Sequence, residues 1–247
     1  MKILAFNGSP RMKRGVTDQI LQTFLKGAAS AGADTETIYV AEKNIKFCTG
    51  CLNCWFVTPG TCIHKDDMPE IREKIRAADM VVLGSPVFFD GFTAQIKMML
   101  DSLIAGGVPF IEFRDGHSRH PSRGGEKKKR KMLLISTCGF GEKDNFDPII
   151  THMKAMAKNF ATGEYMGALV RPVGSTLELL KDENPEGVKG VLDAFYQAGS
   201  EAVTKGVISE ELQEAVAVPL ISLKEFVNRA NKLFHDMIAD KKAPMQK

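Results

Sequence analysis

Five short apolar segments, most of them separated by stretches with helical spacing, occur in the first 170 residues of this chain of 247 residues. Glycine, proline, serine or asparagine bounds the segments, which is typical of buried strands. Alternating strands and helices require right-handed crossovers, and these give a parallel sheet with helices on both faces. The predicted strands are residues 2–6, 35–40, 80–83, 131–136 and 165–170.

Capping residues and apolar spacing place the helices. Thr17 opens the first helix, and Asp66 with Asp67 caps the second. The later helices are predicted at residues 93–103, 148–160, 187–205 and 220–239. We therefore expect an α/β fold with a doubly wound five-stranded parallel sheet. Residues 1–205 are expected to form the main domain, and residues 206–247 a helical extension packed on it.

Composition narrows the functional classes. The hydrophobic fraction of 44% and the charged fraction of 26% are those of an ordinary globular protein. A net charge of +3 is too small to indicate nucleic-acid binding, and no apolar run has the length of a membrane span or signal peptide. We expect a cytoplasmic protein without membrane or nucleic-acid partners, in which the five cysteines are thiols or metal ligands.

Two segments lack a structural period. Residues 108–130 are rich in Gly, Pro, His and Arg, and they form a longer loop than compact domains usually contain. Such an insertion is either a lid or partner surface, or a simple surface excursion. The basic run at residues 126–131 is either a solvated loop or a docking patch for an acidic partner or a phosphate.

Ligands of parallel sheets bind beyond the carboxyl ends of the strands, so the loops after the first, third and fourth strands deserve most weight. The first loop brings hydroxyls, a guanidinium and backbone N–H groups to a helix N-terminus, where an anion such as phosphate is stabilised. It matches neither GxGxxG nor GxxxxGK[ST], and the alternative is an ordinary Gly-Ser-Pro turn. Its candidate ligand-binding residues are Ser9, Arg11, Gly15, Val16 and Thr17.

The other two loops combine small polar residues with aromatic ones. Aromatic rings at a strand's exit suit a flat apolar ring system, although they also serve to seal a helix against a sheet. The candidate residues of the second loop are Pro86, Val87, Phe88, Phe89 and Asp90. Those of the third are Thr137, Cys138, Gly139 and Phe140.

Three motifs in order, NGSPR with the later Thr17, SPVFFDGFTAQIKMMLD and STCGF, resemble the NADPH-dependent FMN reductase and iron–sulfur flavoprotein branch of the flavodoxin-like superfamily. The resemblance covers about residues 1–170. It implies bound FMN, with the phosphate at Ser9, Arg11 and Thr17 and the isoalloxazine between the second and third loops. It also implies NAD(P)H as electron donor and assembly into a homodimer or homotetramer.

Four cysteines, Cys48, Cys51, Cys54 and Cys62, have the spacing CxxCxxCx7C. Three thiolates at this spacing can surround one corner of a cubane while the fourth returns from a short loop. The arrangement resembles the compact motif of the iron–sulfur flavoproteins, which implies a [4Fe–4S] cluster, expected on the same side of the sheet as FMN. Plain flavin reductases with a similar stretch remain an alternative; zinc usually joins two separate Cys pairs.

The resulting hypothesis is an FMN-dependent oxidoreductase that passes electrons from NAD(P)H or a reduced carrier through FMN to a small-molecule or protein acceptor. A cluster would carry them singly. No catalytic acid, base or nucleophile is expected, because the flavin carries the chemistry. One alternative is a non-catalytic electron carrier that docks with redox proteins through the basic insertion, and another is a flavin-free regulatory or structural protein.

Overall fold

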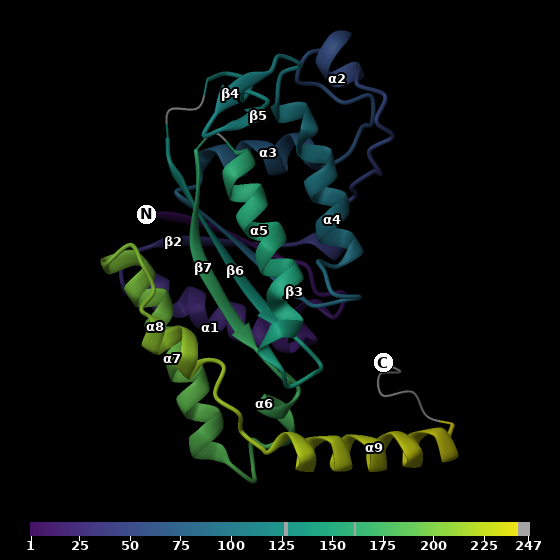
Figure 1. The fold of residues 1–247 in the computed structure, drawn as a ribbon, viewed down its shortest axis with the longest axis vertical. Helices are drawn as coiled ribbons and strands as arrows, with labels where there is room; N and C mark the ends of the chain where they lie inside the picture. Colours follow the sequence, from purple (N-terminus) through teal and green to yellow (C-terminus); the bar gives the residue numbers. More distant parts are fainter. Residues whose placement is uncertain (126–127, 161, 242–247) are drawn as a thin grey trace.

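The computed structural model describes residues 1–125, 128–160 and 162–241. Within this part of the chain, five parallel strands form one sheet in the order β2-β1-β3-β6-β7 (Figure 1). The strands are β1 (Lys2–Asn7), β2 (Asp34–Tyr39), β3 (Met80–Pro86), β6 (Arg130–Thr137) and β7 (Gly163–Arg171). The predicted doubly wound five-stranded sheet is therefore confirmed.

The register of the sheet brings the strand exits together. Asn7 at the end of β1 pairs with Gly84, and Pro86 at the end of β3 pairs with Thr137 at the end of β6. Thr137 pairs in turn with Arg171, the last residue of β7. The loops that follow these four strands consequently emerge at one edge of the sheet.

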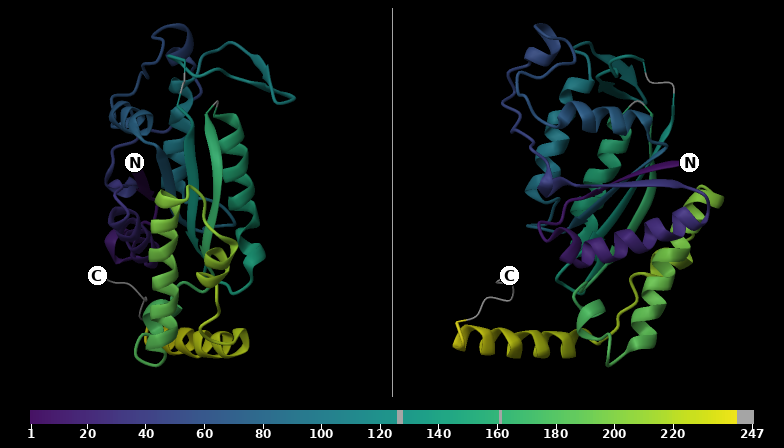
Figure 2. Two further views of the ribbon diagram at one scale, coloured as in Figure 1. Left: turned by 90° about the vertical axis from the view of Figure 1, so that its left-hand side faces the viewer. Right: turned by 180° about the vertical axis from the view of Figure 1, so that it is seen from behind.

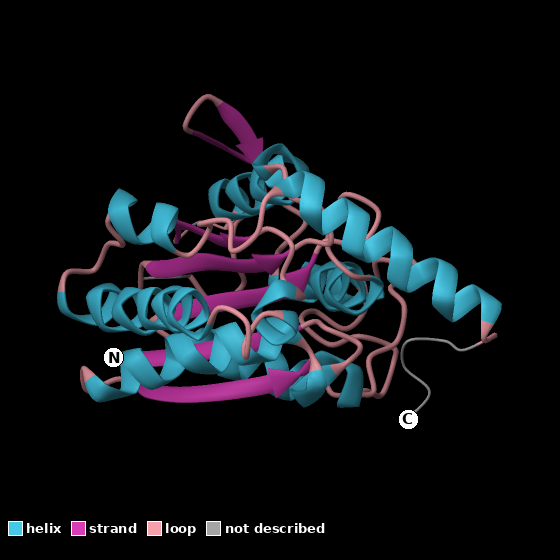
Figure 3. Cartoon of the chain, turned by 90° about the horizontal axis from the view of Figure 1, so that it is seen from below, coloured by secondary structure: helices cyan, strands magenta, loops and turns pink. Residues whose placement is uncertain are grey.

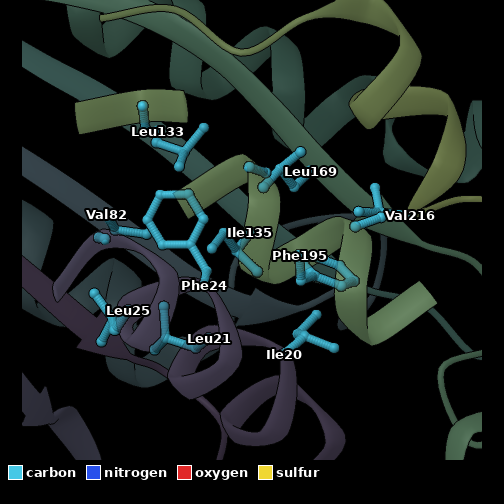
Figure 4. Packing of buried hydrophobic residues seen from close by; sticks show 14 of the residues in the cluster. Ile20, Leu21, Phe24, Leu25, Val82, Leu133, Ile135, Leu169, Phe195 and Val216 are labelled. Carbon is cyan, nitrogen blue, oxygen red and sulfur yellow. The ribbon is translucent and has the colours of Figure 1, made fainter. Parts of the chain in front are cut away.

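Helices cover both faces of the sheet, as Figure 2 shows in its edge-on left view. The first face carries α1 (Val16–Ser30) and α7 (Pro185–Thr204); the second carries α3 (Met68–Ala77), α4 (Ala94–Asp101) and α5 (Asp147–Asn159). Each face buries its own apolar core. In the first core Phe24 and Phe195 are fully buried against Ile135 and Leu169 (Figure 4).

Short elements complete the described fold. They are α2 (Asn53–Phe56), α6 (Thr176–Leu179), α8 (Glu210–Ala215) and the 3₁₀ turns η1 (Met12–Arg14), η2 (Val40–Glu42), η3 (Ser102–Gly106) and η4 (Lys143–Phe146). At the start of α3 the two predicted capping residues, Asp66 and Asp67, accept hydrogen bonds from different segments. Asp66 accepts a hydrogen bond from the Met68 N–H at 3.1 Å, whereas the Asp67 carboxylate accepts from the Asn44 N–H at 2.9 Å.

The insertion at residues 108–130 contains a hairpin that its sequence did not predict. Strands β4 (Glu112–Arg114) and β5 (His117–Arg119) pair antiparallel around Asp115 and Gly116, which both have positive φ, as an Asp-Gly hairpin turn requires. The hairpin projects from the body in the left view of Figure 2. Residues 126–127, which belong both to this insertion and to the basic run, lie outside the described part of the chain.

The segment after α7 returns to the sheet before it leaves the body. The buried Arg171 side chain donates to the carbonyls of Val216 and Val218 at 3.2 and 2.6 Å and to the Thr176 hydroxyl at 3.1 Å. Burial lowers the pKa of Arg171 to about 10. The division at residue 205 stays a prediction, and residues 242–247 of the extension lie outside the described structure.

The last helix, α9 (Leu223–Ala239), extends away from the body (Figures 1 and 3). None of its residues, all of which the structure describes, is buried. Its large exposed apolar side chains are Leu223, Val227, Leu233, Phe234 and Ile238. No helix in the described ranges is long and apolar enough to cross a bilayer.

Candidate functional site

A cavity of about 210 Å³ opens where the loops after β1, β3, β6 and β7 meet. It lies beside the point where the chain crosses from one side of β1 to the other, the usual ligand position in doubly wound sheets. Loops from four strands thus surround one space. Its lining residues are Ser9, Pro10, Arg11, Gly15, Val16, Thr17, Pro86, Val87, Phe88, Thr137, Cys138, Gly139, Gly174 and Ser175.

The first loop is held tightly against its neighbours. The Gly8 N–H donates to the Gly84 carbonyl at 2.7 Å, and the Thr93 hydroxyl donates to the Gly8 carbonyl at 2.8 Å. A Cβ at Gly8 would lie 2.2 Å from Ile96, so the close approach of loop and helix requires glycine. The buried Asn7 side chain accepts from the Ser9 N–H at 2.9 Å. The loop is therefore preorganised before any ligand arrives.

Helix α1 begins at this loop and directs its first turn at the cavity. Gly15 is its N-cap residue and makes no side-chain cap, so first-turn N–H groups remain for a ligand. A helix N-terminus carries partial positive charge, and the exposed Arg11 adds a full one. The buried Thr17 hydroxyl lies 2.9 Å from that of Thr137, which joins the first and third loops.

Three residues of the cavity were not among the predicted candidates: Pro10, which lies within the first loop, and Gly174 and Ser175. The last two come from a loop that we did not predict. They follow β7, whose exit we did not include among the binding loops. The Gly174 N–H donates to the Cys138 carbonyl at 3.0 Å, and a Cβ on Gly174 would lie 3.2 Å from Thr137. Ligands bind beyond all the strand ends that meet at a switch point, so the same rule applied to the fifth strand could have found them.

Of the three candidate phenylalanines, Phe88 lines the cavity. Phe89, Asp90 and Phe140 are not among the described residues that line it, and Phe89 and Phe140 are strongly exposed. Phe89 and Asp90 both have positive φ, in a turn closed by Phe88 and Gly91. Non-glycine residues rarely adopt this conformation unless their surroundings impose it. The assignment of these three residues to a ring-binding site stays a prediction.

The four spaced cysteines also come together. Cys48, Cys51, Cys54 and Cys62 line one small pocket, of about 20 Å³, and all are free thiols. Cys54 is buried, and burial together with the nearby Cys62, Cys48 and Cys51 thiols raises its pKa. His64 lines the same pocket, and its Nε2 atom is buried without a hydrogen-bond partner in the described structure.

Four thiols in one pocket are the donor type that an iron–sulfur cluster takes. No group of three or more His, Cys, Asp or Glu side chains in the described ranges is arranged to hold one metal ion. A cubane bound at its corners holds its thiolates farther apart than one ion does, and four cysteines are its usual ligands. The unpartnered His64 nitrogen is a polar group that an adjacent cluster could satisfy.

The cysteine pocket and the first cavity lie at opposite ends of α4 and η3. Pro86 to Phe88 precede α4 and line the first cavity, whereas Ser102, Ile104 and Ala105 of η3 line the cysteine pocket. Eight α-helical and five 3₁₀ residues span roughly 22 Å. The expectation that the cysteines lie beside the carboxyl ends of the strands is therefore wrong. Figure 1 shows the separation, with α2 above and α6 below.

The fold and the cavity define a flavodoxin-like α/β protein whose switch-point cavity lies at the N-terminus of α1. A sequence profile of the NADPH-dependent FMN reductase family matches residues 1–141, more than half of the chain. The chain belongs to this family.

Similar proteins agree with this placement. An iron–sulfur flavoprotein of Methanocaldococcus jannaschii is 41% identical over 101 residues, which cover 41% of this chain and 51% of that protein. An iron–sulfur flavoprotein of Archaeoglobus fulgidus is 36% identical over 107 residues, which cover 43% of this chain and 47% of that protein. The chain thus spans about half the length of the curated relatives it matches.

Solved structures share the fold at lower identity. An FMN-dependent NADH-azoreductase from Bacillus anthracis, in complex with FMN, has a TM-score of 0.58 and 18% identity, covering 83% of this chain and 99% of that one. RosB with a bound flavin-derived intermediate has a TM-score of 0.55 and 17% identity, and the match covers 100% of this chain and 90% of that one. Both similarities show the common fold.

Proposed function

We propose that this chain is an FMN-dependent oxidoreductase that takes electrons from NAD(P)H and binds FMN in the 210 Å³ cavity. The observation that carries the proposal is the convergence of the three predicted loops on one space at the N-terminus of α1. Family membership and the FMN complex of the azoreductase support it. When bound, FMN supplies the hydride and electron-transfer chemistry.

The residues of the chain position and polarise the cofactor. The first turn of α1 and Arg11 neutralise the phosphate, and the Thr17–Thr137 hydroxyl pair fixes the geometry between the loops. Val87 and Phe88 offer an apolar wall on one side of the cavity. We therefore assign the phosphate to the N-terminus of α1 and the ring to the side of the cavity lined by Val87 and Phe88.

The size of the cavity supports assembly. Pockets that enclose whole ligands usually measure about 300–1,000 Å³, so a space of 210 Å³ holds only part of FMN. The exposed Phe88 lines this space, and the exposed Phe89 and Phe140 directly follow the lining residues Phe88 and Gly139 in sequence. We therefore assign the open side of this space to a second copy of the chain in a homodimer or homotetramer. The five free thiols agree with a reducing, cytoplasmic location.

A double variant tests the phosphate site. Arg11→Ala with Thr17→Ala should be purified without flavin, because charged hydrogen bonds contribute about 1.5–3 kcal/mol each. Lys13→Ala is the matched control, since Lys13 lies in the same turn but outside the cavity and stands over Tyr39. Stoichiometric FMN in the double variant contradicts the assignment. Anaerobic mixing with NADPH then tests the reaction, and reduction by dithionite alone supports the carrier function instead.

We also propose that Cys48, Cys51, Cys54 and Cys62 hold a [4Fe–4S] cluster that transfers single electrons when present. The shared pocket and the names of the relatives support this. Anaerobically purified protein should contain about four iron atoms per chain. Cys51→Ala should lose the iron and keep its flavin, whereas Cys138→Ala should keep the iron. Iron-free protein with full flavin content contradicts the cluster but not the FMN site.

A further inference from the structure

A second cavity, of about 480 Å³, has no role in the proposed reaction. It lies between α3, η3, the hairpin segment and the end of α5, at the far end of α4 from the flavin cavity. Its volume falls within the range of pockets that enclose a small molecule. The sequence pattern contains no indication of this space, because its walls come from five separated segments, including the one that carries Trp55.

Guanidinium groups give the cavity its charge. Arg72, Arg76, Arg119 and Arg123 line it. Arg76 is paired with Glu73, but Arg119 donates to the neutral Asn159 side chain, and Arg123 to the Gly107 and Cys54 carbonyls. The single carboxylate among the described lining residues, Asp101, is already paired with Lys97 at 2.6 Å. The cavity therefore carries an excess of positive charge.

Two of these arginines have buried N–H groups with no acceptor. Arg72 is only 8% exposed, and its Nη1 atom has no hydrogen-bond partner in the described structure. The Nε atom of Arg123 is also buried and has no hydrogen-bond partner in the described structure. A buried donor without an acceptor costs about as much as a lost hydrogen bond, and more when it is charged. Both residues line the cavity, so an anion held there would lie beside two guanidinium groups that each have an unpartnered N–H.

One wall of the cavity is aromatic. The Trp55 and His120 rings lie with their centroids 4.7 Å apart and their planes tilted by 53°. Hydrogen bonds hold both rings, because Trp55 Nε1 donates to the Ile104 carbonyl at 2.8 Å and His120 Nδ1 lies 2.9 Å from the Phe110 carbonyl. A fixed aromatic wall beside guanidinium groups that retain unpartnered N–H groups matches a ligand with a flat ring and an anionic group.

We propose that this cavity binds a nucleotide, with its phosphate at Arg72 and Arg123 and its base against Trp55. A ligand held here lies at the opposite end of α4 from the flavin cavity of the same chain. It is therefore distinct from a hydride donor to that flavin. The proposal does not depend on the cysteine cluster or on the flavin chemistry.

The single tryptophan of the chain makes the test specific, since Trp55 lines the cavity. The FMN-loaded protein is titrated separately with AMP, GMP, CMP and UMP while its tryptophan fluorescence is recorded. We expect at least one to change the Trp55 emission saturably, with much weaker effects from its nucleoside and from inorganic phosphate. If none of the four saturates at millimolar concentration, the proposal is overturned.

Two charge-removing variants locate the phosphate. Arg72→Gln and Arg123→Gln should each raise the Kd of the nucleotide at least tenfold, as expected for a lost charged hydrogen bond. Arg229→Gln is the matched control, because Arg229 lies on α9 and is paired there with Glu225 and Glu183. Unchanged affinity in both cavity variants places the nucleotide elsewhere and overturns the assignment. Flavin content and circular dichroism verify that each variant is folded. If one of the two variants does not fold, the affinity of the other decides the outcome.

Discussion

The contact between α1 and α7 depends on two glycines. A Cβ at Gly27 would lie 1.8 Å from the Tyr196 carbonyl oxygen, and one at Gly199 would lie 1.9 Å from that of Phe24. These atoms belong to backbone, so they cannot rotate away. Ordinary van der Waals contact begins at 3.4 Å, and the helices would have to separate by the difference. We therefore predict that Gly199→Ala destabilises the fold.

The expected magnitude combines two opposing effects. Overpacking costs up to about 3 kcal/mol when backbones must move, whereas replacing a helical glycine by alanine contributes about 1 kcal/mol. The net loss for Gly199→Ala is about 2 kcal/mol, or a fall in Tm of about 4–8 °C. Gly190→Ala in the same helix is the control, because nothing lies within 4 Å of its Cβ. It should gain about 1 kcal/mol.

Urea unfolding followed by circular dichroism, at one protein concentration and with excess FMN, measures both variants. The two free energies of unfolding should differ by about 3 kcal/mol, the sum of the loss and the gain. A Gly199→Ala protein as stable as wild type would refute the packing argument. The consequence reaches the cavity, since α1 also presents its N-terminus to the proposed phosphate.

Three further predictions concern single side chains. Thr137→Ala removes the hydroxyl partner of Thr17, and the Kd for FMN in a flavin-fluorescence titration should rise about two- to tenfold; an unchanged Kd excludes the pair from the site. Burial and a hydrogen bond with Asp18 raise the pKa of Tyr39 from 10.0 to about 12, so its contribution to stability is complete below pH 10 and lost as the pH rises toward 12. Tyr39→Phe should reduce this alkaline loss in urea unfolding, and an equal loss would contradict the assignment. Arg171→Met removes three hydrogen bonds and should cost about 3 kcal/mol or more of unfolding free energy, whereas a loss below about 1 kcal/mol would show that the bonds contribute little.

Local pattern predicted the sheet well, because each strand carries its own signal. The segment at residues 80–83 is apolar throughout, as a strand covered on both faces must be, and it lies in β3. The loop after each strand then followed from topology. Thr17 and Thr137, 120 residues apart in sequence, could be assigned to one site for this reason alone.

The position of the cysteine pocket could not be predicted in the same way. The chain that leaves β2 is long enough to reach either end of α4, and only tertiary contacts decide between them. Here the Lys46 carbonyl accepts from the Ser102 hydroxyl at 3.3 Å, and Trp55 bonds to Ile104. Hydrogen bonds across about fifty residues leave no periodic trace in a sequence. The same holds for the arginine-lined cavity.

The projecting helix α9 has a consequence for experiments on assembly. An isolated helix of 17 residues is only marginally stable in water, so its order depends on contacts that cover its apolar side. Leu223, Val227, Phe234 and Ile238 recur at intervals of four and seven, which gathers them on one side of the helix. Amide hydrogen exchange should therefore be fast in α9 whenever that side is uncovered, and slow when another surface covers it. The backbone of α9 thus serves as an internal reporter of association, read against α1, which packs on the sheet and α7, in the same sample.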